Sequence, residues 1–194
     1  MTRLVLATHN RHKVVELRRI LADAGLGDVE VLGADDLPGL PDVAETGTTF
    51  AENALGKARA AAEALGVPVI ADDSGIESEA LGGRPGVYSA RFAGEGASDQ
   101  DNLDKLVREA PAGSALAYVC VIALVDPHTA EESLFEGRCT GTMADAPRGT
   151  GGFGYDPIFV PDDGDDGRAM AELTPGEKDA ISHRGRAARA LRSH

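Results

Sequence analysis

The sequence has little of what marks several common classes of protein. Its 194 residues include no tryptophan, and aromatic side chains make up only 4%. The apolar core must therefore come mainly from Ala, Val, Leu and Ile. The two cysteines, Cys120 and Cys139, form neither a CxxC pair nor a disulfide framework. This scarcity argues against a small disulfide-stabilised fold and favours a reducing, cytoplasmic location.

Long apolar segments and an excess of basic residues are also missing. The longest apolar run, 115–125, is well short of the roughly 20 residues that span a membrane. We interpret it as a buried strand and expect no membrane association. Lys and Arg number 19 against 32 Asp and Glu, a formal net charge of −13. Because nucleic-acid surfaces need clustered cations, we expect no nucleic-acid partner, although a few local cations or a metal ion can still attract a small anion.

Hydrophobic periodicity predicts a single α/β domain over residues 1–194. The hydrophobic fraction of 42% and the charged fraction of 26% are ordinary globular values. Helices and strands alternate early and a hairpin follows in mid-chain, which predicts a mixed sheet. Strands are expected at 4–8, 29–32, 67–71, 116–125 and 132–140, and helices at 14–24, 50–65, 101–109 and from 175 to about 191.

The first candidate site is the polar segment 8–13, where the first strand passes into the first helix. Backbone N–H groups at a helix start carry partial positive charge and suit a phosphate. Thr8 and Asn10 add hydrogen-bonding groups, and Lys13 adds a positive charge. A solvated helix start with an ordinary lysine is the alternative that the pattern leaves open.

Two adjacent acids, Asp72 and Asp73, follow the apolar run 67–71. Neighbouring side chains of a strand point to opposite faces. Both acids therefore reach one site only if the strand ends here, and Ser74-Gly75 supplies that break. Mg²⁺ prefers oxygen ligands and often shares itself with substrate phosphates, so we expect a magnesium site with Glu45 as a weaker further ligand. Acids that decorate an exposed turn are the alternative.

The glycine-dense segment 149–156 is a candidate for nucleobase binding. Its glycines permit close approach of a flat ligand, Phe153 offers a ring for stacking, and Asp156 can accept hydrogen bonds from ring N–H groups. The segment is not a P-loop, because no Gly-Lys-Ser/Thr follows. A plain glycine loop is the alternative.

The last predicted helix carries a positive patch in an otherwise acidic chain. The basic residues of this patch are Lys178, Arg184, Arg186, Arg189 and Arg192. Lys178, Ser182, His183 and Arg184 form the candidate motif, in which a single histidine is more often structural than catalytic. The alternative is a solvated amphipathic face, with Ala180 and Ile181 among the residues turned inward.

Taken together, the motifs resemble the inosine/xanthosine triphosphate pyrophosphatase family. The resemblance extends from Leu4 to about Leu191 and implies an elongated α/β fold: a mixed, twisted sheet flanked by helices, with a central nucleotide-binding cleft, in a homodimer. The segments that carry it follow one another in the family's order and are 7–16, 45–58, 71–75, 81–91, 151–157 and 177–184.

The resemblance also implies roles for individual residues. Asp73 would accept the proton of the attacking water, with Ser74 beside the substrate. Glu45 and Asp73, with Asp72, would hold Mg²⁺. The residues implied to hold the triphosphate are Thr8, His9, Asn10, Arg11, His12 and Lys13. Those implied to bind the nucleotide and its base are Phe153, Gly154, Tyr155, Asp156, Lys178, His183 and Arg184.

The implied activity is Mg²⁺-dependent hydrolysis of ITP, dITP and XTP to the monophosphate and pyrophosphate, which removes these purine nucleotides from the pool. A related pyrophosphatase acting on modified pyrimidine nucleotides is one alternative, which the segments 153–156 and 182–184 disfavour. A non-catalytic nucleotide-binding module is another. Against this second alternative, a protein that only binds nucleotides would not need Asp72, Asp73 and Glu45 together with Lys13.

Overall fold

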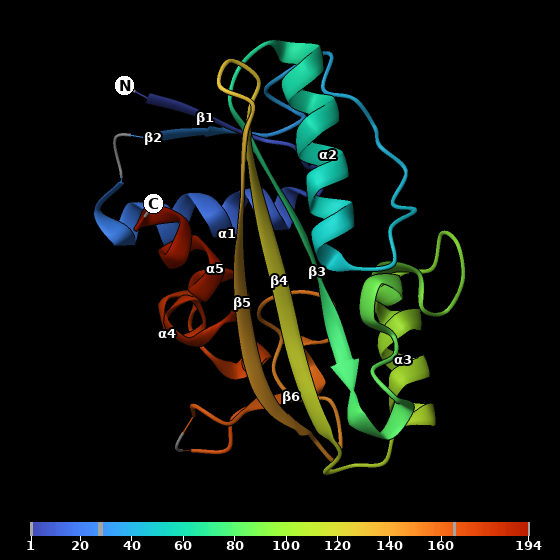
Figure 1. The fold of residues 1–194 in the computed structure, drawn as a ribbon. Helices are drawn as coiled ribbons and strands as arrows, with labels where there is room; N and C mark the ends of the chain where they lie inside the picture. Colours follow the sequence, from blue (N-terminus) through green and yellow to red (C-terminus); the bar gives the residue numbers. More distant parts are fainter. Residues whose placement is uncertain (1, 27–28, 165, 194) are drawn as a thin grey trace. The chain divides into compact units, whose positions relative to one another are not determined.

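The computed structural model describes residues 2–26, 29–164 and 166–193. A 6-stranded sheet has the strand order β2-β1-β3-β4-β5-β6 (Figure 1). β1 pairs in parallel with β2 and β3, whereas β5 and β6 are antiparallel, so the sheet is mixed, as predicted. The strands are β1 (Thr2–Leu6), β2 (Val29–Leu32), β3 (Val69–Ser78), β4 (Ala115–Asp126), β5 (Glu131–Met143) and β6 (Phe159–Pro161).

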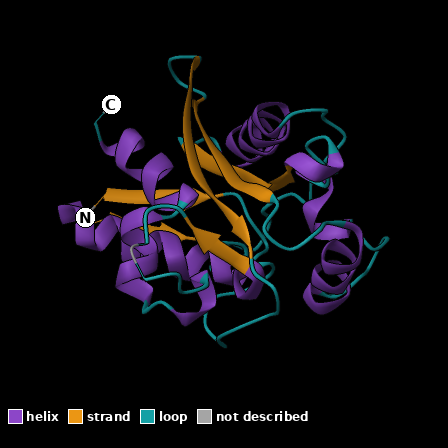
Figure 2. Cartoon of the chain, turned by 90° about the horizontal axis from the view of Figure 1, so that it is seen from below, coloured by secondary structure: helices purple, strands orange, loops and turns teal. Residues whose placement is uncertain are grey.

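Helices and short helical turns lie between most of these strands and after the last one, whereas a turn alone joins β4 to β5 (Figure 2). No helix in the described part of the chain is long and apolar enough to cross a membrane. The α-helices are α1 (Arg11–Leu21), α2 (Phe50–Leu65), α3 (Asp99–Glu109), α4 (Pro175–Ile181) and α5 (His183–Arg192). The shorter turns are a π-helical one at Ala22–Leu26 and 3₁₀ ones at Glu79–Leu81, Gly86–Arg91, Asp156–Ile158 and Met170–Glu172.

Local sequence signals account for several helix ends. The Thr49 side chain accepts a hydrogen bond from the Glu52 backbone in a reciprocal capping box, as predicted for the start of α2. Gly66 ends that helix with a left-handed φ of 65°. A further capping box, between Ser98 and Asp101, starts α3 and was not predicted.

Two predicted boundaries are wrong. β3 does not end at Asp72 but continues to Ser78, because pairing within the sheet outweighs the turn tendency of Ser74-Gly75. The terminal helix is not continuous, since it is interrupted at Ser182 between α4 and α5. Ser182 has an extended backbone (φ −65°, ψ 155°), the conformation of an N-cap residue, for which serine is well suited.

The chain divides into two compact units, each with its own apolar core. The first unit comprises Met1–Asp73, Cys120–Gly137 and Arg184–His194, and the second comprises Ser74–Val119 and Arg138–His183. The expectation of one domain over 1–194 stays a prediction. Fully buried side chains fill both cores: Leu6, Leu17, Ile70 and Ile122 in the first, and Ile76, Leu106, Ile158 and Phe159 in the second.

Candidate functional site

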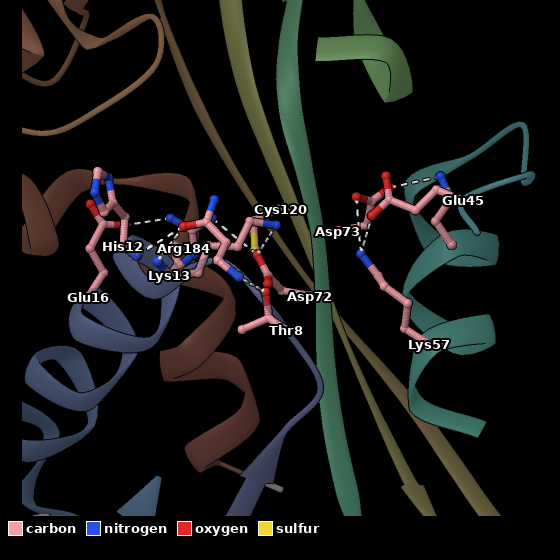
Figure 3. A network of polar contacts seen from close by, with 12 residues as sticks. Thr8, His12, Lys13, Glu16, Glu45, Lys57, Asp72, Asp73, Cys120 and Arg184 are labelled. Carbon is pink, nitrogen blue, oxygen red and sulfur yellow. Dashed lines mark hydrogen bonds and ion pairs between the residues drawn. The ribbon is translucent and has the colours of Figure 1, made fainter. Parts of the chain in front are cut away.

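Asp72 and Asp73 of β3 are both buried, with only 3% and 4% of their surfaces exposed. Since the strand continues past them, the two side chains point to opposite faces, as strand geometry requires. Figure 3 shows the two carboxylates on opposite sides of β3. The expected strand break that would bring both acids together is therefore wrong. Their burial also excludes the alternative of acids decorating an exposed turn.

The Asp72 carboxylate lies between two cations. Its Oδ2 is 3.0 Å from Lys13 Nζ and 3.1 Å from Arg184 Nη2. Burial alone would raise the pKa of Asp72, but the charges of Lys13 and Arg184 outweigh burial and hold the pKa well below its usual value. The thiol of Cys120 lies 4.0 Å from the same oxygen, and burial raises its pKa to about 12, so it remains protonated and can donate. Asp72 is therefore ionised at neutral pH.

Arg184 connects Asp72 to a second buried acid. Its Nη1 is 2.5 Å from Oε2 of Glu16, a buried residue of α1. Burial lowers the pKa of Arg184, but Asp72 and Glu16 together raise it above its usual value. This chain of ion pairs links α1, α5 and β3 within the first unit (Figure 3).

On its other face, β3 places Asp73 close to a lysine that also pairs with Glu45. Lys57 Nζ is 2.7 Å from Glu45 Oε1 and 3.4 Å from Asp73 Oδ1. The Asn53 side-chain amide donates a hydrogen bond of 3.0 Å to Asp73 Oδ2. Burial raises the pKa of Asp73, and the charge of Glu45 adds to that rise, while Lys57 opposes it. Because the net shift is upward, Asp73 is a better proton acceptor than an ordinary aspartate.

Asn53 and Lys57 had no role assigned from sequence. They are four residues apart on α2 and therefore share one helix face. Burial lowers the pKa of Lys57, but Asp73, Asp72 and Glu45 outweigh burial and raise it overall. Two polar residues on the face that also carries the buried Ala54 and Ala58 were the available sequence signal, since an amphipathic helix normally turns only apolar residues inward.

The Glu45 and Asp73 carboxylates offer oxygen ligands of the kind that a divalent cation prefers. Among the described residues, no three His, Cys, Asp or Glu side chains gather as a complete metal-binding group. Mg²⁺ does not require one, because it is commonly held by one or two carboxylates together with substrate phosphates. Both carboxylates contact the same ammonium group, that of Lys57, and a metal ion held by the two stays a prediction. Asp72 faces the opposite way, and its role as a metal ligand stays a prediction.

The predicted phosphate segment is the start of α1, as expected. Asn10 is the N-cap residue, whose Oδ1 accepts from the backbone N–H of His12 (2.9 Å) and of Lys13 (3.3 Å). Thr8 Oγ1 accepts from the backbone N–H of Asn10 at 3.2 Å. Local side-chain bonds thus hold the helix start in a fixed conformation.

The remaining residues of this segment differ in exposure. His9, Arg11 and His12 are exposed, whereas Lys13 is largely buried against Asp72. Arg11 forms an exposed ion pair with Asp35, 2.6 Å long. A pocket of about 170 Å³ lies at this end of α1, and Thr8, His9 and Arg11 are among the residues that line it. Phosphate binding by the segment stays a prediction.

In the second unit, Asp156 gathers three donors around one buried carboxylate. Its Oδ2 accepts from Lys178 Nζ at 2.6 Å and from the Phe153 backbone N–H at 2.9 Å. Its Oδ1 accepts from the Tyr118 hydroxyl at 3.1 Å. Lys178 Nζ also lies 5.1 Å from the centroid of the Phe153 ring, within the range of a cation–π contact. The alternative of a solvated terminal helix fails here, because Lys178 is buried while Ala180 is exposed.

The glycine-dense segment is shaped by these contacts. Gly152 has a φ of 69°, and a side chain there would collide with the Asp156 carboxylate, so the position requires glycine. The Gly154 backbone N–H donates to Asp99 Oδ2 at 3.1 Å. Tyr155 is buried and donates its hydroxyl to the Ser89 carbonyl at 2.7 Å. The segment is thus more than a plain glycine loop.

Two further residues that the sequence singled out, His183 and Ser74, also lie in the second unit. The His183 ring stacks on Tyr118, with centroids 4.6 Å apart and planes 6° from parallel. Ser74 is half-buried within β3.

The mixed sheet and these buried acids, lysines and arginine define an α/β protein suited to phosphate chemistry. The chain belongs to the Ham1 family, whose model matches residues 4–194. It is 53% identical over 195 residues to a dITP/XTP pyrophosphatase of Streptomyces coelicolor, an alignment that covers 98% of this chain and 96% of that one. It is 54% identical over 189 residues to a protein of the same name from Symbiobacterium thermophilum, with 95% and 90% covered.

Solved structures agree with this assignment. A HAM1 protein from Coxiella burnetii matches with a TM-score of 0.86 at 39% identity, covering 100% of this chain and 98% of that one. A nucleoside-triphosphatase/dITP/XTP pyrophosphatase from Mycobacterium abscessus matches with a TM-score of 0.74 at 44% identity, covering 98% and 97%. The predicted α/β fold and the family resemblance are confirmed.

Proposed function

We propose that this protein hydrolyses dITP, ITP and XTP to the corresponding monophosphate and pyrophosphate. Relatives more than half identical over nearly the whole chain are named for dITP and XTP. The observation that carries the proposal is the partly buried cluster in which Glu45 and Asp73 share Lys57 and the pKa of Asp73 is raised. An acid whose pKa is raised and which lies beside a cation is suited to accept a proton in phosphate chemistry.

In the proposed mechanism, Glu45 and Asp73 would hold a magnesium ion, and the ion would supply positive charge to offset that of the phosphates. Asp73 takes the proton of a water molecule whose oxygen bonds to the α-phosphorus. The bond from that phosphorus to the bridging oxygen breaks, and pyrophosphate leaves. Lys57 contacts both acids and Asn53 donates to Asp73 Oδ2, so these two residues would hold the Asp73 carboxylate in one orientation.

The second unit would recognise the purine. Phe153 provides a ring for stacking, and Lys178, held by Asp156, provides a donor for the 6-keto oxygen of hypoxanthine or xanthine. Adenine carries an amino group at that position, so the ammonium group of Lys178 would face another hydrogen-bond donor and the contact would be lost. A site built around one hydrogen bond rejects the wrong partner by roughly 10⁴-fold.

The phosphate-binding role would fall to the start of α1 and to the cations near it. The charge of Lys13 and the partial positive charge at the start of a helix favour anions. The expectations of a homodimer and of a cytoplasmic location rest on the family resemblance and on the two cysteines, and are part of the proposal. Sedimentation of the purified protein tests the dimer independently of its activity.

A substrate panel tests the proposed activity. Purified protein is incubated with dITP, XTP, dGTP, dATP and a modified pyrimidine triphosphate, with and without Mg²⁺, and pyrophosphate is resolved from orthophosphate. We expect Mg²⁺-dependent release of pyrophosphate from dITP and XTP. Orthophosphate as the product, or equal turnover of dATP, would refute the proposal. Preference for the pyrimidine would favour the related pyrophosphatase instead.

A further inference from the structure

Tyr118 of β4 contacts two of the residues to which purine recognition is assigned. Its hydroxyl donates to Asp156 Oδ1 at 3.1 Å, and its ring stacks on His183 at 4.6 Å. The Tyr118 ring also contacts the apolar ring of Phe159, with the two ring centroids 4.7 Å apart and the ring planes tilted by 45°. Tyr118 itself is buried, so its hydrogen bond is shielded from water.

The hydroxyl and the ring have separable effects. Asp156 is a buried carboxylate whose Oδ2 already accepts from Lys178 and from the Phe153 backbone. A donor at Oδ1 fixes the rotation of the carboxylate and hence the direction in which Lys178 is held. Without the hydroxyl, a buried charge loses a hydrogen bond and gains freedom to turn. The ring alone is sufficient for stacking against His183, because a phenylalanine ring presents the same face.

We propose that Tyr118 is a positioning residue for base recognition. Its hydroxyl orients Asp156, and through it Lys178, while its ring orients His183. Tyr118 then acts on substrate binding and base choice and leaves the phosphorus chemistry at Asp73 unchanged. This inference rests on the proposed function, because it presumes that Asp156, Lys178 and His183 meet the purine.

The test compares Tyr118→Phe and Tyr118→Leu with the wild type in steady-state hydrolysis of dITP and dATP. For Tyr118→Phe we expect KM for dITP to rise roughly tenfold and kcat to change by less than about twofold, the loss of one hydrogen bond to a charge. The preference for dITP over dATP, as a ratio of kcat/KM, should fall about fivefold. Tyr118→Leu should raise KM further, because it also removes the stacking on His183.

Ser89→Ala is the matched control for a purely structural role. The Ser89 hydroxyl lies in the same unit and accepts from the Ile76 backbone at 2.9 Å and donates to the Gly86 carbonyl at 2.7 Å. Its loss should lower the melting temperature without changing KM or base preference.

Two outcomes would overturn this inference alone and leave the proposed function in place. A Tyr118→Phe protein with unchanged KM and base preference, whatever its melting temperature, would show that the hydroxyl is structural only. A fall in kcat at constant KM would place Tyr118 in the chemistry instead. A wild type that releases no pyrophosphate from dITP would instead refute the proposed function, and this inference with it.

Discussion

Asp72 and Asp73 are neighbours in β3, yet their carboxylates lie on opposite faces of the strand and have different partners (Figure 3). Asp72 is paired with two cations, and its pKa is lowered, whereas burial raises the pKa of Asp73. Two acids whose pKa values are pushed apart by their surroundings commonly serve different functions. Here one stabilises the fold in its ionised form and the other is suited to accept a proton.

Asp73→Asn should abolish turnover while stabilising the apoprotein. Loss of a general base lowers kcat by about 10²–10⁴-fold. The folded-state pKa of Asp73 is raised, so above that pKa its charge costs stability, and a neutral residue removes the cost. We expect a melting temperature about 2–4 °C higher at neutral pH, equivalent to about 1 kcal/mol. Unaltered kcat, or a lower melting temperature, would contradict the account of Asp73.

Asp72→Asn should do the reverse and destabilise the protein. Removing one partner of a buried ion pair costs about 3 kcal/mol. Because the folded-state pKa is lowered, the contribution of Asp72 is fully present above the unfolded-state pKa of about 3.9 and is lost as the pH falls toward the folded-state value. Urea unfolding at about pH 7, 4 and 2.5 should show that the difference in unfolding free energy between mutant and wild type narrows only below about pH 4. A gap independent of pH would mean that the charge is unimportant.

Lys57→Gln should move the acidic limb of the pH–rate profile. The Lys57 charge opposes the rise that burial imposes on the pKa of Asp73. Without this charge the pKa of Asp73 rises further, so activity should begin to fall at a higher pH than in the wild type. Arg59→Gln is the matched control, because Arg59 is on the same helix but pairs with Glu132 at the surface. An unshifted profile in Lys57→Gln would remove Lys57 from the mechanism.

Gly152→Ala should disrupt the purine-binding cluster. The new methyl group would collide with the Asp156 carboxylate, and the left-handed backbone adds strain. We expect KM for dITP to rise at least tenfold and the melting temperature to fall. Gly56→Ala is a control in open space within α2, where alanine should stabilise the helix by about 0.5–1 kcal/mol. Equal effects of the two substitutions would contradict the proposed crowding at Gly152.

Sequence patterns predicted those parts of the fold that local chemistry controls. The Thr49 cap, the Gly66 stop and the start of α4 at Pro175 all appear where expected, since each depends on residues a few positions apart. The end of β3 could not be predicted, because pairing with distant strands carries it through Ser74-Gly75. The break at Ser182 was missed for a related reason, since the helical pattern continues on both sides of it.

For the candidate site, too, sequence predicted what depends on the residue itself and missed what depends on distant contacts. The acids and the cationic residues stand out in sequence because buried charge needs a partner. The residues that pair with them could not be recognised from sequence, because they are distant along the chain. Tyr118 is 38 positions from Asp156, and Glu16 is 168 positions from Arg184. Their pairing exists only in the folded chain. Within the segment 8–13, sequence could not separate Lys13, which contacts Asp72, from the exposed His9 and His12.

The central claim is that water attacks the α-phosphorus of dITP and releases pyrophosphate. Hydrolysis of dITP with Mg²⁺ in ¹⁸O-labelled water, followed by mass spectrometry of both products, tests it most directly. The account predicts that one labelled oxygen appears in dIMP and that the pyrophosphate is unlabelled. Label in pyrophosphate or in orthophosphate would place the attack at another phosphorus and contradict the account.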